Sequence, residues 1–277
     1  MLEKKIIFGT ASLNLEYGIN SRKERTNSDT LLELIFNNNI HYFDTALEYN
    51  NDKLIGEFLK KFNFKAKIYT KGNIFGEFDS FVKSFEIHIK NLGKIPEYFL
   101  IRSHNSLKKN NVYKTLRYFS ENFPNMIIGA SIYDQKDYSF FNEFDISIIQ
   151  YPHNLINEFN LIKKKNATFI VRSIFLQGLL TINNNISLNN KKLNKYLNDF
   201  NNDYFLFLKE KNINPIDLCM SNMILNKSID KFIISTNNIS QFKEIIEFKT
   251  LNKDLIDEVK LFLFNYEKKF FDPRLWI

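Results

Sequence analysis

Eight short apolar segments recur along the chain, and longer segments with helical periodicity separate them. This alternation predicts repeated β-α units and therefore a parallel sheet. Eight such units in about 250 residues are typical of a (β/α)8 TIM barrel, whereas an open doubly wound sheet usually stops at about five or six strands. We therefore expect an α/β protein with one TIM-barrel domain over residues 1–277. The predicted strands are residues 5–10, 41–44, 67–71, 98–102, 126–130, 146–150, 168–172 and 231–235.

The segments between these strands carry apolar stripes at helical spacing, most clearly from Phe78 to Leu92. Asn214 followed by Pro215 predicts a helix start, because asparagine can cap free amides and proline loses nothing at the first helical position. The Asn-rich stretch 181–195 is either a mobile lid over an active site or a tolerated insertion. Further helices are predicted at residues 29–37, 52–62, 112–121, 155–165, 196–211, 215–226 and 255–266.

Charge and composition narrow the functional classes. The net charge is +7, but lysines are spread along the chain and interleaved with acids, so we expect no nucleic-acid partner. The run 163–165 is expected to close a helix and complement its dipole. A single cysteine, Cys219, excludes a disulfide framework, and no apolar run is long enough for a bilayer span. We expect a cytoplasmic protein with no membrane partner and no metal.

Polar residues gather where the predicted strands end, which is the end of a TIM barrel that carries the chemistry. Taken singly, each has a structural explanation: Asp44 as a cap, Tyr49 as a packed ring, Lys71 in solvent and His104 in a loop. Taken together, an acid, a phenol, an ammonium and an imidazole on one rim favour function. The other polar residues at these ends are Ser131, Gln150, Asn154, Arg172, Ser235 and Thr236.

This set is suited to giving a proton to a carbonyl oxygen. A phenol is a weak acid at neutral pH, but a nearby ammonium stabilises the phenolate and makes the transfer easier. We therefore expect Lys71 to tune Tyr49 as general acid. Asp44 would hold Lys71 charged and oriented, and His104 would hydrogen-bond the substrate oxygen.

The segment from His41 to Tyr49, followed by Lys71 and His104, resembles the catalytic signature of the aldo-keto reductases. The resemblance extends over nearly the whole chain, through segments 8–11, 17–18, 129–131, 149–154, 172–180 and 233–236. It implies a barrel that binds NADPH without a Rossmann motif, with Asp44, Tyr49, Lys71 and His104 as the catalytic tetrad. It also implies cofactor contacts for Ser131, Gln150, Arg172, Ser235, Thr236 and Gln241.

The chain departs from the family pattern at several of these places. Asn50, Asn51 and Asp52 follow the tyrosine where the family usually has Gly and then an acid, and Ile132 stands where many members have Asn. Arg172 stands where many members stack an aromatic ring on nicotinamide. Because Ser235 and Gln241 lack the charge that a 2′-phosphate needs, NADH is not excluded, although Lys243 is nearby.

The resemblance implies an NAD(P)H-dependent reductase of an aldehyde or ketone. A likeness of residues 172–180 and 272–276 to reductases linked with surface-polysaccharide synthesis points to a sugar. Two alternatives remain: an impaired barrel that acts as a nucleotide-binding or partner module, and a lyase that forms a Schiff base at Lys71. Trp276, the only tryptophan, is expected to be a packing anchor. The identity of the substrate, the reaction direction and the oligomeric state are not predicted.

Overall fold

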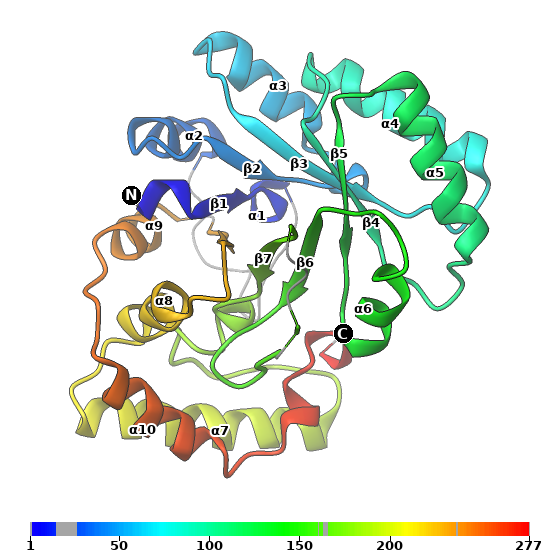
Figure 1. Cartoon of the computed structure of the whole chain (residues 1–277). Coiled ribbons are helices and arrows are strands. Elements are labelled where there is room, and N and C mark those ends of the chain that lie inside the picture. Colours follow the sequence, from blue (N-terminus) through cyan, green and yellow to red (C-terminus); the bar gives the residue numbers. More distant parts are fainter. Residues whose placement is uncertain (1, 15–26, 160, 163–165, 237, 277) are drawn as a thin grey trace.

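The computed structural model describes residues 2–14, 27–159, 161–162, 166–236 and 238–276. Within these ranges eight parallel strands close into one barrel in chain order, and β1 pairs with β8 (Figure 1). The predicted (β/α)8 TIM barrel is confirmed. The strands are β1 (Ile6–Gly9), β2 (Tyr42–Asp44), β3 (Lys67–Gly72), β4 (Tyr98–Arg102), β5 (Ile127–Ser131), β6 (Ile148–Pro152), β7 (Thr168–Arg172) and β8 (Lys231–Ile234).

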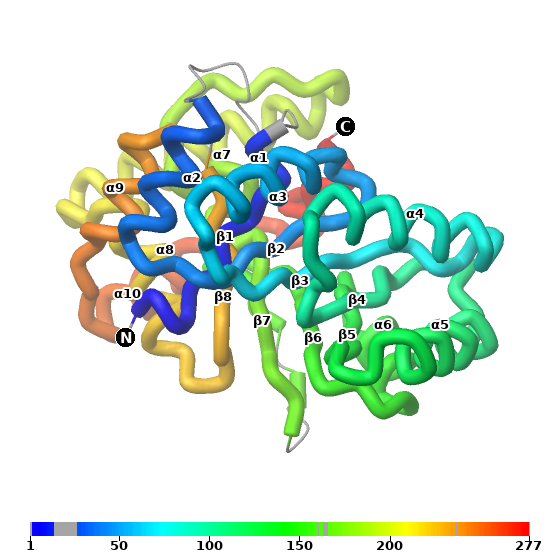
Figure 2. The backbone as a smooth tube through the Cα atoms, turned by 90° about the horizontal axis from the view of Figure 1, so that it is seen from above, coloured from blue at the N-terminus to red at the C-terminus, as the bar shows by residue number. Residues whose placement is uncertain are grey.

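Helices surround the strands, as the view from above shows (Figure 2). The C-terminal segment lies toward the end of the barrel where α1 follows β1, and the N-terminal segment lies toward the opposite end. No helix in the described ranges is both long and apolar enough to cross a bilayer. The helices are α1 (Ala11–Asn14), α2 (Ser28–Asn37), α3 (Asp52–Lys61), α4 (Phe78–Leu92), α5 (Lys109–Asn122), α6 (Gln135–Phe141), α7 (Lys191–Glu210), α8 (Pro215–Leu225), α9 (Ile239–Ile246) and α10 (Lys253–Leu263).

The predicted helix over residues 155–165 is wrong where the structure describes that segment. Its described part is irregular, because Asn154 Oδ1 accepts hydrogen bonds from the backbone N–H groups of Ile156 and Asn157 and forms a turn. The predicted lysine run 163–165 lies outside the described residues, as do residues 17–18 of the family resemblance. The short helices α6 and α9 were not predicted, since seven and eight residues carry little periodic signal.

The Asn-rich stretch is bonded to the helix that follows it. Helix α7 begins at Lys191 rather than near 196, with the Asn190 side chain capping it. Asn198 on α7 binds both the N–H and the C=O of the buried residue Ile186, at 2.8 and 2.9 Å. Residues 181–190 therefore lack regular structure but are held on α7 by specific hydrogen bonds.

The strands alternate between two faces with a period of two. Their outward side chains join the large apolar core under the helices. Their inward side chains fill the barrel, and at the carboxyl ends the next inward position on most strands is polar. We call this inward layer the polar ring: Asp44, Lys71, Arg102, Ser131, Gln150, Arg172 and Ser235. The inward apolar layer below it is Ile7, Tyr69, Leu100, Ile148, Ile170 and Ile233.

Helices α3 and α4 come into close contact at Gly56. A Cβ on Gly56 would lie 2.2 Å from Asn91 O and 2.9 Å from Leu92 O, which are backbone atoms of α4. We expect Gly56→Ala to lower the free energy of unfolding by about 2 kcal/mol or more, although alanine favours helices by about 1 kcal/mol. Urea unfolding measures this, with Gly76→Ala as the control because a Cβ there meets nothing within 4 Å. Equal stability of both variants would contradict the close packing.

Candidate active site

A pocket of about 330 Å³ opens at the carboxyl ends of the strands. Its size lies in the usual range for small-molecule sites. It runs from Asp44, Tyr49 and Lys71 past the loop after β7 to the segment after β8. The predicted residues that line it are Asp44, Tyr49, Lys71, Arg172, Ser235, Thr236 and Gln241, and further lining residues are Ser12, Ile174, Phe175, Gln177, Gly178, Ile182 and Glu244.

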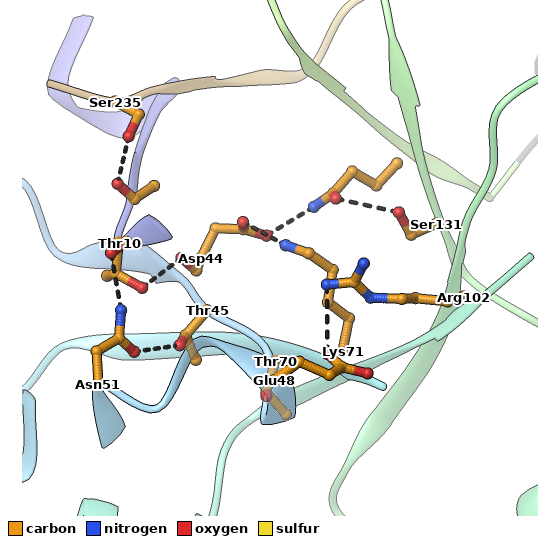
Figure 3. Close-up of polar contacts among 12 residues, drawn as sticks. Thr10, Asp44, Thr45, Glu48, Asn51, Thr70, Lys71, Arg102, Ser131 and Ser235 are labelled. Atoms are coloured by element: carbon orange, nitrogen blue, oxygen red, sulfur yellow. Dashed lines mark hydrogen bonds and ion pairs between the residues drawn. The ribbon is translucent and has the colours of Figure 1, made fainter. Parts of the chain in front are cut away.

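A buried ion pair lies at one end of this pocket. Lys71 Nζ donates to Asp44 Oδ2, and both side chains are almost fully buried (Figure 3). Asp44 Oδ1 accepts a second hydrogen bond from Gln150 Nε2 at 2.8 Å, and Ser131 Oγ donates to Gln150 Oε1 at 3.3 Å. Because burying an unpaired charge is costly, this network holds the Asp44 carboxylate and the Lys71 ammonium in one arrangement.

Tyr49 faces this ion pair from the loop after β2. It ends the 3-10 helix Leu47–Tyr49, and Lys71 Nζ lies 5.3 Å from the centre of its ring. An ammonium over the ring is attracted to it and lies where it would stabilise a phenolate. The structure therefore brings together the predicted Asp44, Tyr49 and Lys71.

The loop after Tyr49 keeps its shape despite its departure from the family pattern. Asn50 has φ 52° and ψ 32°, a left-handed conformation that asparagine tolerates better than most residues. Asn51 is buried, where its side chain accepts from Thr45 Oγ1 at 3.0 Å and donates to Thr10 O at 2.7 Å. These bonds tie the loop to β1 and β2, so Tyr49 is held in place.

The structure places His104 apart from this group. His104 is exposed, its ring stacks on Phe75 with centres 3.8 Å apart, and its Nδ1 accepts from Ser106 N at 3.0 Å. Neither His104 nor Arg102 is among the residues that line the pocket. The residue of β4 that approaches Tyr49 is Arg102, and its guanidinium pairs with Glu48 (Figure 3). The expectation that His104 joins Tyr49 therefore lacks support in the geometry, and the physical reason is that β4 ends two residues earlier.

Gln150 and Ser131 also differ from expectation. Gln150 is fully buried, and both ends of its side-chain amide are bonded within the protein, to Asp44 and to Ser131. Neither residue lines the pocket. In this structure they position Asp44, so a contact to a nicotinamide carboxamide would require these bonds to rearrange. Ile132, a departure from the family pattern, is buried in the apolar core.

The far end of the pocket is built from hydroxyl and amide groups. Ser235 Oγ donates to Gly9 O at 2.8 Å and lies 2.8 Å from the Ser12 hydroxyl, and Thr236 Oγ1 donates to Gln241 Oε1 at 2.8 Å. Glu244 adds a carboxylate to this wall, and no lysine or arginine is among its described residues. Lys243 does not line the pocket. Among the described residues, this end is therefore polar and carries no positive charge.

The loop after β7 forms one wall of the pocket with an unusual backbone. Ser173, Leu176 and Gln177 have φ values of 61°, 48° and 55°, and Gly178 has φ 95°. Left-handed conformations cost free energy in residues other than glycine and persist only where the surroundings hold them. Ser173, Gln177 and Gly178 line the pocket, so this conformation shapes its wall.

Arg172 and the C-terminal segment meet at Tyr133. The guanidinium carbons of Arg172 and Arg274 lie 4.5 and 4.8 Å from the centre of the Tyr133 ring. Arg172 Nη2 also donates to Ile132 O at 3.0 Å. Trp276 is buried in a core cluster, and its Nε1 donates to Phe270 O at 3.0 Å, which confirms the packing-anchor prediction.

Comparisons with known proteins agree with this geometry. Residues 5–116 match the family model described as the aldo/keto reductase family. Over these residues the resemblance to the aldo-keto reductases is confirmed. The aldo-keto reductase match covers β1 to β4 and part of α5, and so includes Asp44, Tyr49 and Lys71. No curated protein matches the chain.

The fold likeness extends over the rest of the barrel. A solved structure of a glycerol dehydrogenase from Gluconobacter oxydans is similar with a TM-score of 0.72 and 15% sequence identity. The likeness covers 95% of this chain and 93% of that chain. At this identity the comparison supports the barrel fold.

His153, which follows β6, should make the free energy of unfolding depend on pH. Burial lowers the pKa of His153 to about 4, and its Nδ1 accepts from Phe159 N at 3.2 Å. The unfolded chain, with a histidine pKa near 6.5, binds the proton first, so stability is present above about pH 6.5 and is lost as pH falls toward 4. Between pH 7 and pH 4.5 this loss is on the order of 2 to 3 kcal/mol.

We expect His153→Asn, which keeps an acceptor near Nδ1, to remove that part of the pH dependence. Urea unfolding of both proteins at pH 7 and pH 4.5 measures it. Equal losses in the two proteins would contradict the assignment to His153.

Proposed function

We propose that this protein is a nicotinamide-dependent reductase of an aldehyde or ketone, with Tyr49 as general acid. One observation supports this most: the buried Asp44–Lys71 ion pair lies beside Tyr49 at one end of a pocket that continues to a polar wall. The aldo-keto reductase match and the barrel fold point to the same class of oxidoreductase.

The donor set of the pocket fits a dinucleotide. Serine, threonine and glutamine side chains at the far end suit ribose and phosphate oxygens, and the apolar residues Ile174 and Phe175 offer packing for a ring. When bound, a dihydronicotinamide would supply a hydride to the carbonyl carbon. By the family resemblance its ring would lie near Tyr49 and its adenosine near Ser235 and Gln241.

The chain itself handles the proton. Tyr49 would donate its phenolic proton to the carbonyl oxygen as the hydride arrives, which leaves an alcohol and a phenolate. Lys71 would stabilise that phenolate, and the phenolate would regain a proton from solvent. Asp44, held by Gln150, would keep the Lys71 ammonium beside the ring.

The adenosine end favours NADH over NADPH. A 2′-phosphate is a dianion that needs charge-assisted partners, and the described pocket wall offers Ser235, Gln241 and the Glu244 carboxylate instead. A carboxylate repels a phosphate but accepts hydrogen bonds from ribose hydroxyls.

Two features argue against the rival functions. Lys71 donates to Asp44, and an ammonium engaged in this way has no lone pair with which to form a Schiff base. The departures at Asn50 and Ile132 fit the fold without disturbing Tyr49, so they do not by themselves indicate an impaired site.

The test is a titration of the purified protein with NADH and NADPH, followed by the fluorescence of the nucleotide. We expect NADH to bind at least tenfold more tightly, and an aldehyde or aldose then to oxidise bound NADH. If neither NADH nor NADPH binds, the proposed function is overturned. Tighter binding of NADPH would overturn only the cofactor preference.

A further inference from the structure

The inward face of β4 ends in an arginine. Leu100 lies in the inward core, so the side chain two residues later, Arg102, has the same phase. Arg102 also pairs with Ser131 across β4 and β5, and Ser131 belongs to the polar ring. Strand β4 therefore brings Arg102 to the layer that holds Asp44 and Lys71.

Arg102 faces Tyr49 and is held there by Glu48. Its guanidinium carbon lies 5.8 Å from the centre of the Tyr49 ring, and its Nη2 lies 3.3 Å from Glu48 Oε2. Glu48 is fixed in turn by Asn73, whose Nδ2 donates to Glu48 Oε1 at 3.0 Å. Burial opposes the charge on Arg102, but the electrostatic effects of Glu48, of the two tyrosines nearby and of Asp44 outweigh it, so the pKa of Arg102 is raised. The guanidinium is therefore a permanent cation beside the phenol.

Arg102 also has a donor that nothing in the described structure satisfies. Its Nε is buried and has no hydrogen-bond partner among the described residues. A buried N–H left unpaired costs about 1 to 3 kcal/mol. An oxygen bound beside Tyr49, or a small turn of the guanidinium toward one, would recover part of that cost.

His104 is engaged elsewhere. Its ring stacks on Phe75 at the surface, its Nδ1 is used by Ser106 N, and it follows the end of β4 by two residues. To reach the Tyr49 hydroxyl it would have to leave both contacts.

Resting on the reductase function proposed above, we propose that Arg102, rather than His104, is the residue of β4 that binds the substrate's carbonyl oxygen beside Tyr49. As the hydride reaches the carbonyl carbon, the C=O π electrons move onto oxygen, and Tyr49 supplies the proton. Arg102 donates a hydrogen bond to that oxygen throughout and transfers no proton. Its positive charge stabilises the negative charge that develops on oxygen in the transition state.

The test compares Arg102→Gln with His104→Gln, using NADH with 4-nitrobenzaldehyde and with glyceraldehyde. We expect Arg102→Gln to lower kcat about a hundredfold, because one oxyanion donor is lost, and to change the NADH dissociation constant less than about threefold. Arg102→Lys keeps the positive charge but lacks the planar guanidinium with its several donors, so its kcat should be about tenfold lower than that of the parent. His104→Gln should stay within about threefold of the parent.

A pH profile distinguishes a role at the oxygen from a merely structural one. Arg102→His places a group that titrates near pH 6.5 at this position, so its kcat should fall as pH rises from about 5.5 to 8. The parent should show no decrease centred near pH 6.5, since arginine stays charged. A role limited to holding Glu48 would give no new pH dependence in Arg102→His.

The inference is overturned if His104→Gln loses the activity and Arg102→Gln keeps it. It is also overturned if Arg102→Gln loses NADH binding together with kcat, or if Arg102→His has a flat profile. The parent enzyme is assayed first: lack of turnover with both aldehydes would overturn the reductase function itself. Turnover that is indifferent to Arg102 would overturn this inference alone.

Discussion

Tyr49→Phe is expected to lower kcat by about a thousandfold while the NADH dissociation constant stays within about threefold of the parent. The lost hydroxyl is the proposed proton donor, whereas the ring that packs beside Lys71 remains. Steady-state kinetics with 4-nitrobenzaldehyde, together with the nucleotide titration, measures both quantities.

The matched control is Tyr133→Phe. Tyr133 lies at the same rim, between Arg172 and Arg274, and its ring provides those contacts without the hydroxyl. We expect this variant to keep most of its activity. Near-normal kcat in Tyr49→Phe would remove Tyr49 from the role of general acid.

Lys71→Met is expected to cost both activity and stability. It leaves the Asp44 carboxylate buried with Gln150 as its remaining side-chain partner, and breaking a buried pair in this way costs about 3 to 5 kcal/mol. We also expect kcat to fall about a thousandfold, because no ammonium remains to stabilise the phenolate. Urea unfolding and steady-state kinetics measure the two effects.

The double variant Asp44→Asn with Lys71→Met separates the loss of stability from the loss of activity. Removing the carboxylate as well should restore most of the lost stability, because no unpaired charge is left in the core, but it should restore none of the activity. A stable Lys71→Met protein would show that Asp44 does not depend on Lys71. Recovered activity in the double variant would contradict the role of Lys71.

The alternation of strands and helices was enough to predict the barrel, because the eight strands are short apolar runs that alternate with longer segments of helical periodicity. The segment 155–165 misled the prediction. Its apolar residues Leu155 and Ile156 are buried by a turn that Asn154 forms, and a side chain bonding to backbone leaves no periodic signal.

The placement of the candidate site residues was predicted where the inward face of a strand and the family pattern select the same residue. Asp44 and Lys71 lie on the inward faces of β2 and β3, and the structure brings them together with Tyr49. For β4 the two signals disagree: the pattern selects His104, whereas the period of two selects Arg102. Counting inward positions from Leu100 would have found Arg102 in the sequence.

Glu244 and the wall formed by residues 173–178 could not be predicted from the sequence. Glu244 lies on the short helix α9, whose existence was not foreseen, and reaches the pocket only through tertiary packing. Ser173, Leu176 and Gln177 in the loop after β7 have positive φ values without being glycines, so their conformation has no marker in the sequence.

The central claim is that a hydride reaches a carbonyl carbon beside Tyr49. Incubation of the protein with NADH deuterated at C4 on both faces and 4-nitrobenzaldehyde, followed by mass spectrometry of the alcohol, tests it most directly. The account predicts one deuterium on the former carbonyl carbon, at a rate that Tyr49→Phe lowers about a thousandfold. An unchanged aldehyde, or an alcohol without deuterium, would contradict it.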